Sequence, residues 1–331
     1  MVKWVEVIKM LFDKKIKEMY KKSLFSRADK TNDIRFFSSA DFEGLREIPY
    51  SFVTGKGDKL VGAFYSYEGY VKNRLVVFDH GMGQGGHRAY MREIERLCKR
   101  GYLVFSYDHT GCNDSEGEST GGFSQSLADL DACLKSIKKN ADFAGYDISV
   151  MGHSWGGYST LNIAAFHPDV KHVISLSGPI SLKDMQKQSF PGIAAIFRKS
   201  VYAMEVESNP DYVDANAIDA LSKSDAALLY IHSADDPIVK AKNHFLKLKS
   251  AIGKRENTKF ILLNGRAHNP NYTDDAVKYL GEFFADLTAK RAAGELNTEK
   301  ACKEFVDSYD FWRMTEQDDA VWDEVFKTLE I

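Results

Sequence analysis

Long apolar runs are missing from this sequence of 331 residues. Near the amino terminus, charged residues such as Glu6, Lys9 and Asp13 interrupt every apolar stretch, so no run there could serve as the core of a secretory signal or span a bilayer. We therefore expect a soluble, cytoplasmic protein that is not an integral membrane protein.

Cysteine is scarce, and neither sign of charge dominates. The four cysteines, Cys98, Cys112, Cys133 and Cys302, show no metal-ligand spacing, and we expect reduced thiols rather than a disulfide framework. The chain has 44 basic and 47 acidic residues, which gives no reason to expect a nucleic acid as a partner. The sequence does not determine the oligomeric state, and a homodimer is possible.

Apolar strand patterns alternate with amphipathic helix patterns through most of the chain. Strands are expected at residues 47–54, 60–67, 75–79, 102–107, 148–151, 172–176, 227–232 and 260–263, and helices at 90–100, 123–138, 155–166, 238–252 and 273–287. The first two strands flank Gly55-Lys56-Gly57-Asp58, which predicts a hairpin. This alternation predicts the α/β class, with a mostly parallel central sheet and helices on both faces.

Three segments lie outside this regular pattern. Within the core, which we place at residues 47–290, residues 178–225 show no strand but an apolar helical cluster, and we expect a small cap over the carboxyl ends of the strands. The alternative is a helix packed on the core. The amino-terminal segment 1–46 contains an amphipathic helix at 3–22 and a linker, whereas residues 291–331 form an acidic helical extension.

The amino-terminal helix has a lysine-rich face opposite its apolar face. Such a helix could lie on an anionic membrane, but we favour docking on its own domain. Because the carboxyl-terminal extension carries the opposite charge, we expect these two segments to pack together.

Residues 147–157, Asp-Ile-Ser-Val-Met-Gly-His-Ser-Trp-Gly-Gly, place a serine on a turn between a strand and a helix. Gly152 and Gly156 flank Ser154 at two residues' distance, where a Cβ atom would collide with the neighbouring strand or helix. A Gly-x-Ser-x-Gly motif arises by chance in roughly one chain in ten of this length, so the strand before it and the helix after it carry the prediction.

A serine nucleophile needs a base and a group that orients that base. Downstream of Ser154, the polar clusters 233–237 and 264–268 each follow a predicted strand, so both should lie at the same edge of the sheet as Ser154. The second cluster ends in His268, and the first offers Asp235 and Asp236 as competing acids. The other histidines fall where structural or surface roles are expected.

A glycine-rich loop, His80-Gly81-Met82-Gly83-Gln84-Gly85-Gly86, follows the strand 75–79. Glycines let the backbone turn close to a substrate, so this loop can present N–H donors to a developing negative charge. A phosphate-binding loop is disfavoured because no Lys-Ser/Thr pair follows the glycines.

These motifs together resemble the α/β-hydrolase superfamily. The residues that carry the resemblance are His80-Gly81-Met82, Asp108-His109-Thr110-Gly111 with Ser115 and Gly117, Gly152-His153-Ser154-Trp155-Gly156, Asp236-Pro237, and 265–268. Within the superfamily, the chain is similar to the capped acylglycerol-lipase, serine-aminopeptidase and cinnamoyl-esterase-like serine hydrolases, over roughly residues 47–290. Asn113 stands where the family loop usually has its second glycine, and both terminal helices are extra.

The resemblance implies a Ser-His-Asp triad. Ser154 would be the nucleophile, His268 the base and Asp236 the acid, since Asp236-Pro237 resembles the acid-bearing loop of the family. The backbone N–H groups of Met82 and Trp155 would form the oxyanion hole.

The reaction implied is hydrolysis of a small-molecule carboxylic ester through an acyl-enzyme, with no metal or organic cofactor. Apolar cap residues favour a short or aromatic acyl group. The main alternative is a serine aminopeptidase, or another amide or thioester hydrolase, and an aminopeptidase would use Glu205, Glu207, Asp211 or Asp214 to hold a free amine. A ligand-binding member of the fold without turnover is a third hypothesis.

Overall fold

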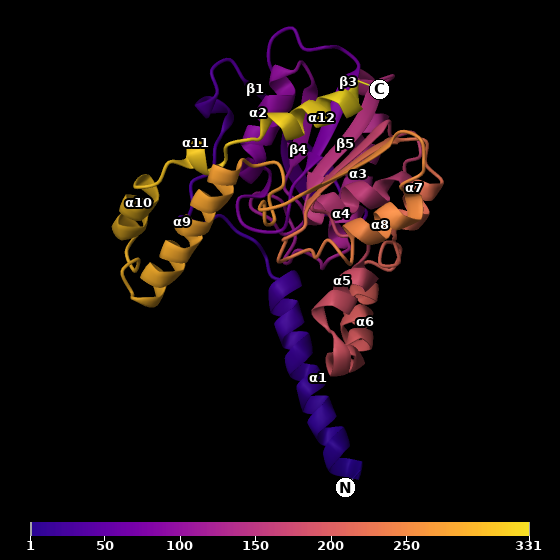
Figure 1. The fold of residues 1–331 in the computed structure, drawn as a ribbon, viewed down its shortest axis with the longest axis vertical. Helices are drawn as coiled ribbons and strands as arrows, with labels where there is room; N and C mark the ends of the chain where they lie inside the picture. Colours follow the sequence, from indigo (N-terminus) through magenta and orange to yellow (C-terminus); the bar gives the residue numbers. More distant parts are fainter. Residues whose placement is uncertain (1, 331) are drawn as a thin grey trace.

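One eight-stranded sheet runs through the molecule in the computed structural model, which describes residues 2–330 and the side chains from Phe12 to Glu330 (Figure 1). Its strands are β1 (Arg46–Val53), β2 (Lys59–Ser66), β3 (Arg74–Asp79), β4 (Leu103–Tyr107), β5 (Asp147–His153), β6 (His172–Leu176), β7 (Ala227–Ser233) and β8 (Thr258–Leu263). The strand order is β1-β2-β4-β3-β5-β6-β7-β8. The β1–β2 and β2–β4 pairs are antiparallel and all others are parallel, which confirms the predicted sheet.

Helices cover both faces of this sheet. They include α2 (Met91–Lys99), α3 (Gln125–Lys139), α4 (Trp155–Asn162), α7 (Ala217–Ser222), α8 (Phe245–Ile252), α9 (Asp274–Ala292), α10 (Glu299–Asp307), α11 (Phe311–Met314) and α12 (Asp319–Leu329). One buried apolar cluster joins the sheet to α3, α4, α7 and α8, and the other joins it to α2, α9 and the last three helices. Because successive strand residues point to opposite faces, Val76 and Val77 of β3 belong to different clusters.

The segment between β6 and β7 contains α5 (Leu182–Ser189), the 3₁₀ helix η5 (Gly192–Phe197) and α6 (Arg198–Ser208), followed by α7. The first helix, α1 (Val2–Leu24), packs against α6 and projects from the same side of the body (Figure 1). The Tyr20 hydroxyl donates a hydrogen bond of 2.7 Å to the Glu205 carboxylate, which fastens the end of α1 to α6. In the described part of the chain, no helix is long and apolar enough to cross a membrane.

The expected packing of the acidic extension on the amino-terminal helix is wrong. The extension lies on another part of the molecule (Figure 1), where α12 packs on β6 and β7 and Trp322 is completely buried. Two of its acidic groups pair at α2 instead, Asp319 with Arg96 of the helix and Glu330 with Arg100 directly after it. Exposed ion pairs contribute little free energy, so the apolar face of α12 outweighs the charge pattern in deciding where the extension docks.

The helix expected at residues 238–252 begins only at Phe245. The Asp236 carboxylate accepts hydrogen bonds from the N–H groups of Ile238 and Val239, at 2.8 and 2.9 Å. These bonds hold residues 236–239 in a turn around the carboxylate. A helix that began at residue 238 would not keep both N–H groups at the carboxylate.

Candidate functional site

Ser154 occupies the sharp turn between β5 and α4. Its φ angle is 55°, in the left-handed region that residues other than glycine rarely adopt. A Cβ atom on Gly152 would overlap the carbonyl group of Gly156, and one on Gly156 would overlap the carbonyl group of Asp79. The two glycines are therefore required for the close approach of strand and helix, as the sequence predicted.

His268 and Asp236 meet Ser154 at the carboxyl edge of the sheet. His268 Nε2 lies 2.8 Å from Ser154 Oγ, and His268 Nδ1 lies 2.8 Å from Asp236 Oδ2. Burial opposes the charge on Asp236, but His268 and the two backbone N–H donors hold the pKa of this carboxyl below its usual value. The group is therefore an ionised acceptor for the imidazole.

Asp235, the competing acid, has a different set of partners. Its carboxylate accepts hydrogen bonds from the N–H groups of Gly265, at 2.9 Å, and Ala267, at 3.3 Å. These bonds fix the turn at residues 265–267, which directly precedes His268. Between the two aspartates, only Asp236 contacts the imidazole.

Met82 and Trp155 line the same cavity as Ser154. Trp155 is the first residue of α4, so its N–H group has no acceptor within the helix. The N–H group of Met82 has no hydrogen-bond acceptor among residues 2–330. Neither N–H group therefore has an acceptor among the described residues, and both residues line the cavity that Ser154 also lines.

The cavity at Ser154 has a volume of about 440 Å³ and a mainly apolar wall. The insert contributes Leu182, Met185 and Phe190 to this wall. The first helix contributes Ile16, Met19, Tyr20, Ser23 and Leu24. No sequence signal connected α1 with the site, because its apolar period predicts an amphipathic helix but not the surface that the helix covers.

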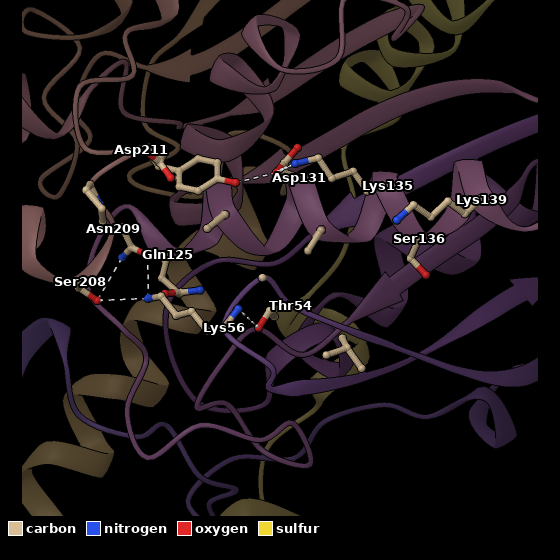
Figure 2. A pocket seen from close by; sticks show the side chains of 16 residues that line it. Thr54, Lys56, Gln125, Asp131, Lys135, Ser136, Lys139, Ser208, Asn209 and Asp211 are labelled. Atoms are coloured by element: carbon tan, nitrogen blue, oxygen red, sulfur yellow. Dashed lines mark hydrogen bonds and ion pairs between the residues drawn. The ribbon is translucent and has the colours of Figure 1, made fainter.

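A second, larger cavity of about 600 Å³ lies over α3, beside the β1–β2 turn (Figure 2). The Lys56 ammonium group in this cavity already bonds Gln125 and Asn209, at 2.6 and 2.9 Å, and Asp131 bonds Lys135 at 2.6 Å. Several charged and polar side chains line it, and none of the five predicted site residues is among them. We therefore assign the candidate site to the smaller cavity.

Tyr90 and His153 connect the glycine-rich loop to the His268 loop. The Gly81 N–H donates to Tyr90 Oη at 3.1 Å, the Tyr90 hydroxyl donates to His153 Nδ1 at 2.8 Å, and His153 Nε2–H donates to the His268 carbonyl at 2.8 Å. Burial, reinforced by His268, lowers the pKa of His153 to about 3, so its ring is neutral and serves both roles. We call this chain the Tyr90–His153 brace. His153 lies within the serine motif, but nothing in the sequence pointed to Tyr90.

A charged histidine lies beneath the serine turn. His109 is completely buried, 3.1 Å from both the Asp79 and Asp129 carboxylates, and its ring packs on Trp155. Burial alone would lower its pKa, but the two carboxylates outweigh that effect and raise it to about 10. The resulting imidazolium ties β3 and α3 together under the site.

None of the four carboxylates considered for an aminopeptidase lines the cavity. Glu205 is completely buried and accepts hydrogen bonds from the Tyr20 hydroxyl and the backbone N–H groups of Phe123 and Ser124. Glu207, Asp211 and Asp214 are exposed. In the described residues, no group of three or more histidine, cysteine, aspartate or glutamate side chains has an arrangement that could hold a metal ion.

Comparisons with known proteins concern the family and the fold of the chain. A protein-family model described as serine aminopeptidase, S33, matches residues 71–218. An uncharacterised protein of Acanthamoeba polyphaga mimivirus is 25% identical over 233 residues, which cover 65% of this chain and 74% of that protein. The monoglyceride lipase of Rattus norvegicus is 28% identical over 151 residues, 44% of this chain and 48% of the lipase, so the match spans about half of that relative.

Among solved structures, the Pyrococcus furiosus esterase Pf2001 superposes with a TM-score of 0.57 at 19% identity, over 86% of this chain and 99% of the esterase. The Pyrococcus horikoshii acylaminoacyl peptidase gives a TM-score of 0.55 at 19% identity, over 74% of this chain and 42% of the peptidase. At these identities the likeness concerns the fold alone.

Proposed function

The chain belongs to the α/β-hydrolase superfamily, and we propose that it is a serine hydrolase that cleaves a carboxylic ester through an acyl-enzyme. The observation that carries the proposal is the pair of 2.8 Å contacts by which His268 joins Ser154 to Asp236 beside an apolar cavity. A nucleophile, a base and an orienting acid in this geometry suit acyl transfer.

In the proposed reaction, His268 Nε2 takes the proton of Ser154 as the Oγ atom attacks the ester carbonyl. The carbonyl oxygen becomes negative and accepts hydrogen bonds from the N–H groups of Met82 and Trp155. His268 then gives its proton to the departing alcohol. Water attacks the acyl-enzyme with the same base, and Asp236 stabilises the imidazolium in both steps.

The cavity wall supports an apolar acyl group. Its volume of about 440 Å³ falls within the range of small-ligand sites, and Leu182, Met185 and Phe190 would contact an aliphatic or aromatic acyl chain. In this proposal residues 178–225 act as a cap, which is completed by the last turns of α1. A serine aminopeptidase has less support, because no carboxylate among the lining residues could hold a free amine.

Hydrolysis of p-nitrophenyl esters from acetate to decanoate tests the proposal. Ser154→Ala and His268→Ala should each lower kcat by about 10⁴-fold. Ser222→Ala is the control, because Ser222 is exposed on α7 and does not line the cavity, and this variant should keep its activity. A wild-type protein that hydrolyses none of the esters and is not labelled at Ser154 by a fluorophosphonate would refute the proposal.

A further inference from the structure

The apolar face of α1 begins inside the Ser154 cavity and continues beyond the body of the protein. Ile16, Tyr20 and Leu24 line the cavity, and their spacing of four residues places them on one face of the helix. Phe12, one turn further out on this face, is 57% exposed, and Met19 at the cavity wall is 59% exposed. The face therefore leads from solvent into the site.

Other exposed apolar side chains come from segments beside the same cavity. Ile193 and Ile196 of η5, which follows the cavity-lining helix α5, are 89% and 55% exposed, and Ile238 in the cavity wall is 54% exposed. Figure 1 shows α1 and the α5–α6 segment projecting from the same side of the molecule. We call Phe12, Met19, Ile193, Ile196 and Ile238 the apolar rim. An apolar group of this kind on a surface marks an interaction site.

The rest of the exposed part of α1 is basic. Residues 12–24 contain five lysines and two acidic residues, an excess of three positive charges in a chain whose net charge is −3. Two of these lysines pair with Asp13 and Glu18. Lys15, Lys21 and Lys22 have no ionic partner among the described residues. Apolar side chains beside unpaired lysines match the chemistry of an anionic lipid surface.

We propose that α1 and η5 form a docking site for an anionic lipid surface, which places the opening of the Ser154 cavity against the lipid. The Tyr20–Glu205 hydrogen bond holds the last turns of α1 on α6, so the helix stays fixed to the body while its exposed part enters the interface. A second copy of the chain is a poorer occupant, because two α1 helices would bring like charges together.

The docking site deepens the proposed function without depending on it. If Ser154 is the nucleophile, an ester with a lipid-like acyl chain can pass from the lipid layer along the apolar face of α1 into the cavity. Lipid docking itself needs no hydrolysis, and it is tested in the Ser154→Ala background, where the vesicles stay intact.

Vesicle flotation measures the docking directly. The Ser154→Ala protein should float with vesicles of phosphatidylcholine and phosphatidylglycerol more strongly than with phosphatidylcholine alone, and salt should weaken the binding. Adding Phe12→Glu or Ile193→Glu should lower the partition coefficient at least about tenfold. Replacing Lys15, Lys21 and Lys22 together by Gln should lower it about a hundredfold on the mixed vesicles.

Phe284→Glu is the matched control, because Phe284 is 47% exposed on α9, away from α1 (Figure 1), and this variant should bind as the parent does. Circular dichroism checks that every variant is folded. The proposal fails if the parent does not bind the mixed vesicles or if Phe12→Glu binds them equally well. It also fails if sedimentation shows a dimer that Phe12→Glu dissociates while vesicles are not bound. If the wild-type protein hydrolyses no ester while the Ser154→Ala protein still floats with the mixed vesicles, only the proposed enzyme activity is refuted.

Discussion

Replacing Tyr90 by Phe removes one hydroxyl group from the Tyr90–His153 brace and leaves the ring in place. The Gly81 N–H then loses its acceptor, and His153 Nδ1 loses its donor. Both groups lie next to residues with proposed roles, because Gly81 precedes Met82 and His153 bonds the His268 backbone. The substitution therefore disturbs both loops without touching Ser154.

The magnitude follows from the two partners left without hydrogen bonds. Each unsatisfied buried polar group costs about 1–3 kcal/mol, so we expect Tyr90→Phe to lower the free energy of unfolding by about 2–6 kcal/mol. We expect the two loops to relax and recover part of this cost. The relaxation moves His268 from its position beside Ser154 and so raises the activation free energy. An increase of about 1.4 kcal/mol in the activation free energy lowers kcat about tenfold.

The assay is steady-state hydrolysis of a p-nitrophenyl ester well below the unfolding temperature of the variant, together with urea unfolding. We expect kcat to fall about tenfold while KM stays nearly constant, because the brace does not line the cavity. Tyr50→Phe is the matched control. Its hydroxyl makes one hydrogen bond of 2.8 Å to Ser136, remote from the site, so stability should fall slightly and kcat should not change.

An unchanged kcat in Tyr90→Phe, with lowered stability, would show that the brace only supports the fold. The pH dependence gives a second check. Because the pKa of His153 is lowered to about 3, the ring stays neutral at any pH well above that value. The effect of Tyr90→Phe on kcat should therefore be the same at about pH 6 and about pH 9, and an effect confined to one of these would contradict the assignment.

Three further substitutions test the fold around the site. Burial raises the pKa of Glu93 from 4.5 to about 7, although Asn271 and Gln317 donate hydrogen bonds to it. Its stabilising contribution is therefore complete below about pH 4.5 and is lost as the pH rises through 7. Urea unfolding should show wild type losing about 3 kcal/mol relative to Glu93→Gln over that window, and parallel curves would refute it. Trp322→Ala should lower the free energy of unfolding by about 3–5 kcal/mol in urea, because the buried indole leaves a cavity. An unchanged free energy of unfolding would contradict the docking of α12 on the sheet. Gly156→Ala should lower the free energy of unfolding by at least about 3 kcal/mol, because the added Cβ atom overlaps the backbone carbonyl of Asp79. Calorimetry measures this loss, and near-native stability would contradict the turn geometry.

Local patterns explain why the sheet and the serine turn could be predicted from the sequence. The apolar strands and the glycines beside Ser154 are determined by steric rules that act over a few residues. His268 and Asp236 could be placed at the same edge because the carboxyl ends of parallel strands meet there. Position alone could not separate Asp235 from Asp236, since both follow β7, and the choice of Asp236 rested on the resemblance of Asp236-Pro237 to the family's acid-bearing loop. In the structure, Asp236 contacts His268 and Asp235 contacts the Gly265 backbone.

Contacts between distant segments could not be predicted in this way. The charge of the acidic extension suggested α1 as its partner, but burial of Trp322 on the sheet carries far more free energy than exposed ion pairs. Tyr90 gave no signal because its role depends on Gly81 and His153 meeting at one hydroxyl group. Such contacts are set by tertiary packing, which a single sequence does not display.

Glu205 shows how an extra segment becomes part of a site. The sequence offered this carboxylate as a ligand for a substrate amine, yet it accepts hydrogen bonds from Tyr20 of α1 and from the backbone of Phe123 and Ser124. One buried group thus joins α1, α6 and the start of α3. Because Tyr20 and Phe123 also line the cavity, the pocket depends on a helix that lies outside residues 71–218, the part that matches the serine aminopeptidase family model. The range of substrates must therefore be inferred from a cavity that includes α1, and not from the matched segment alone.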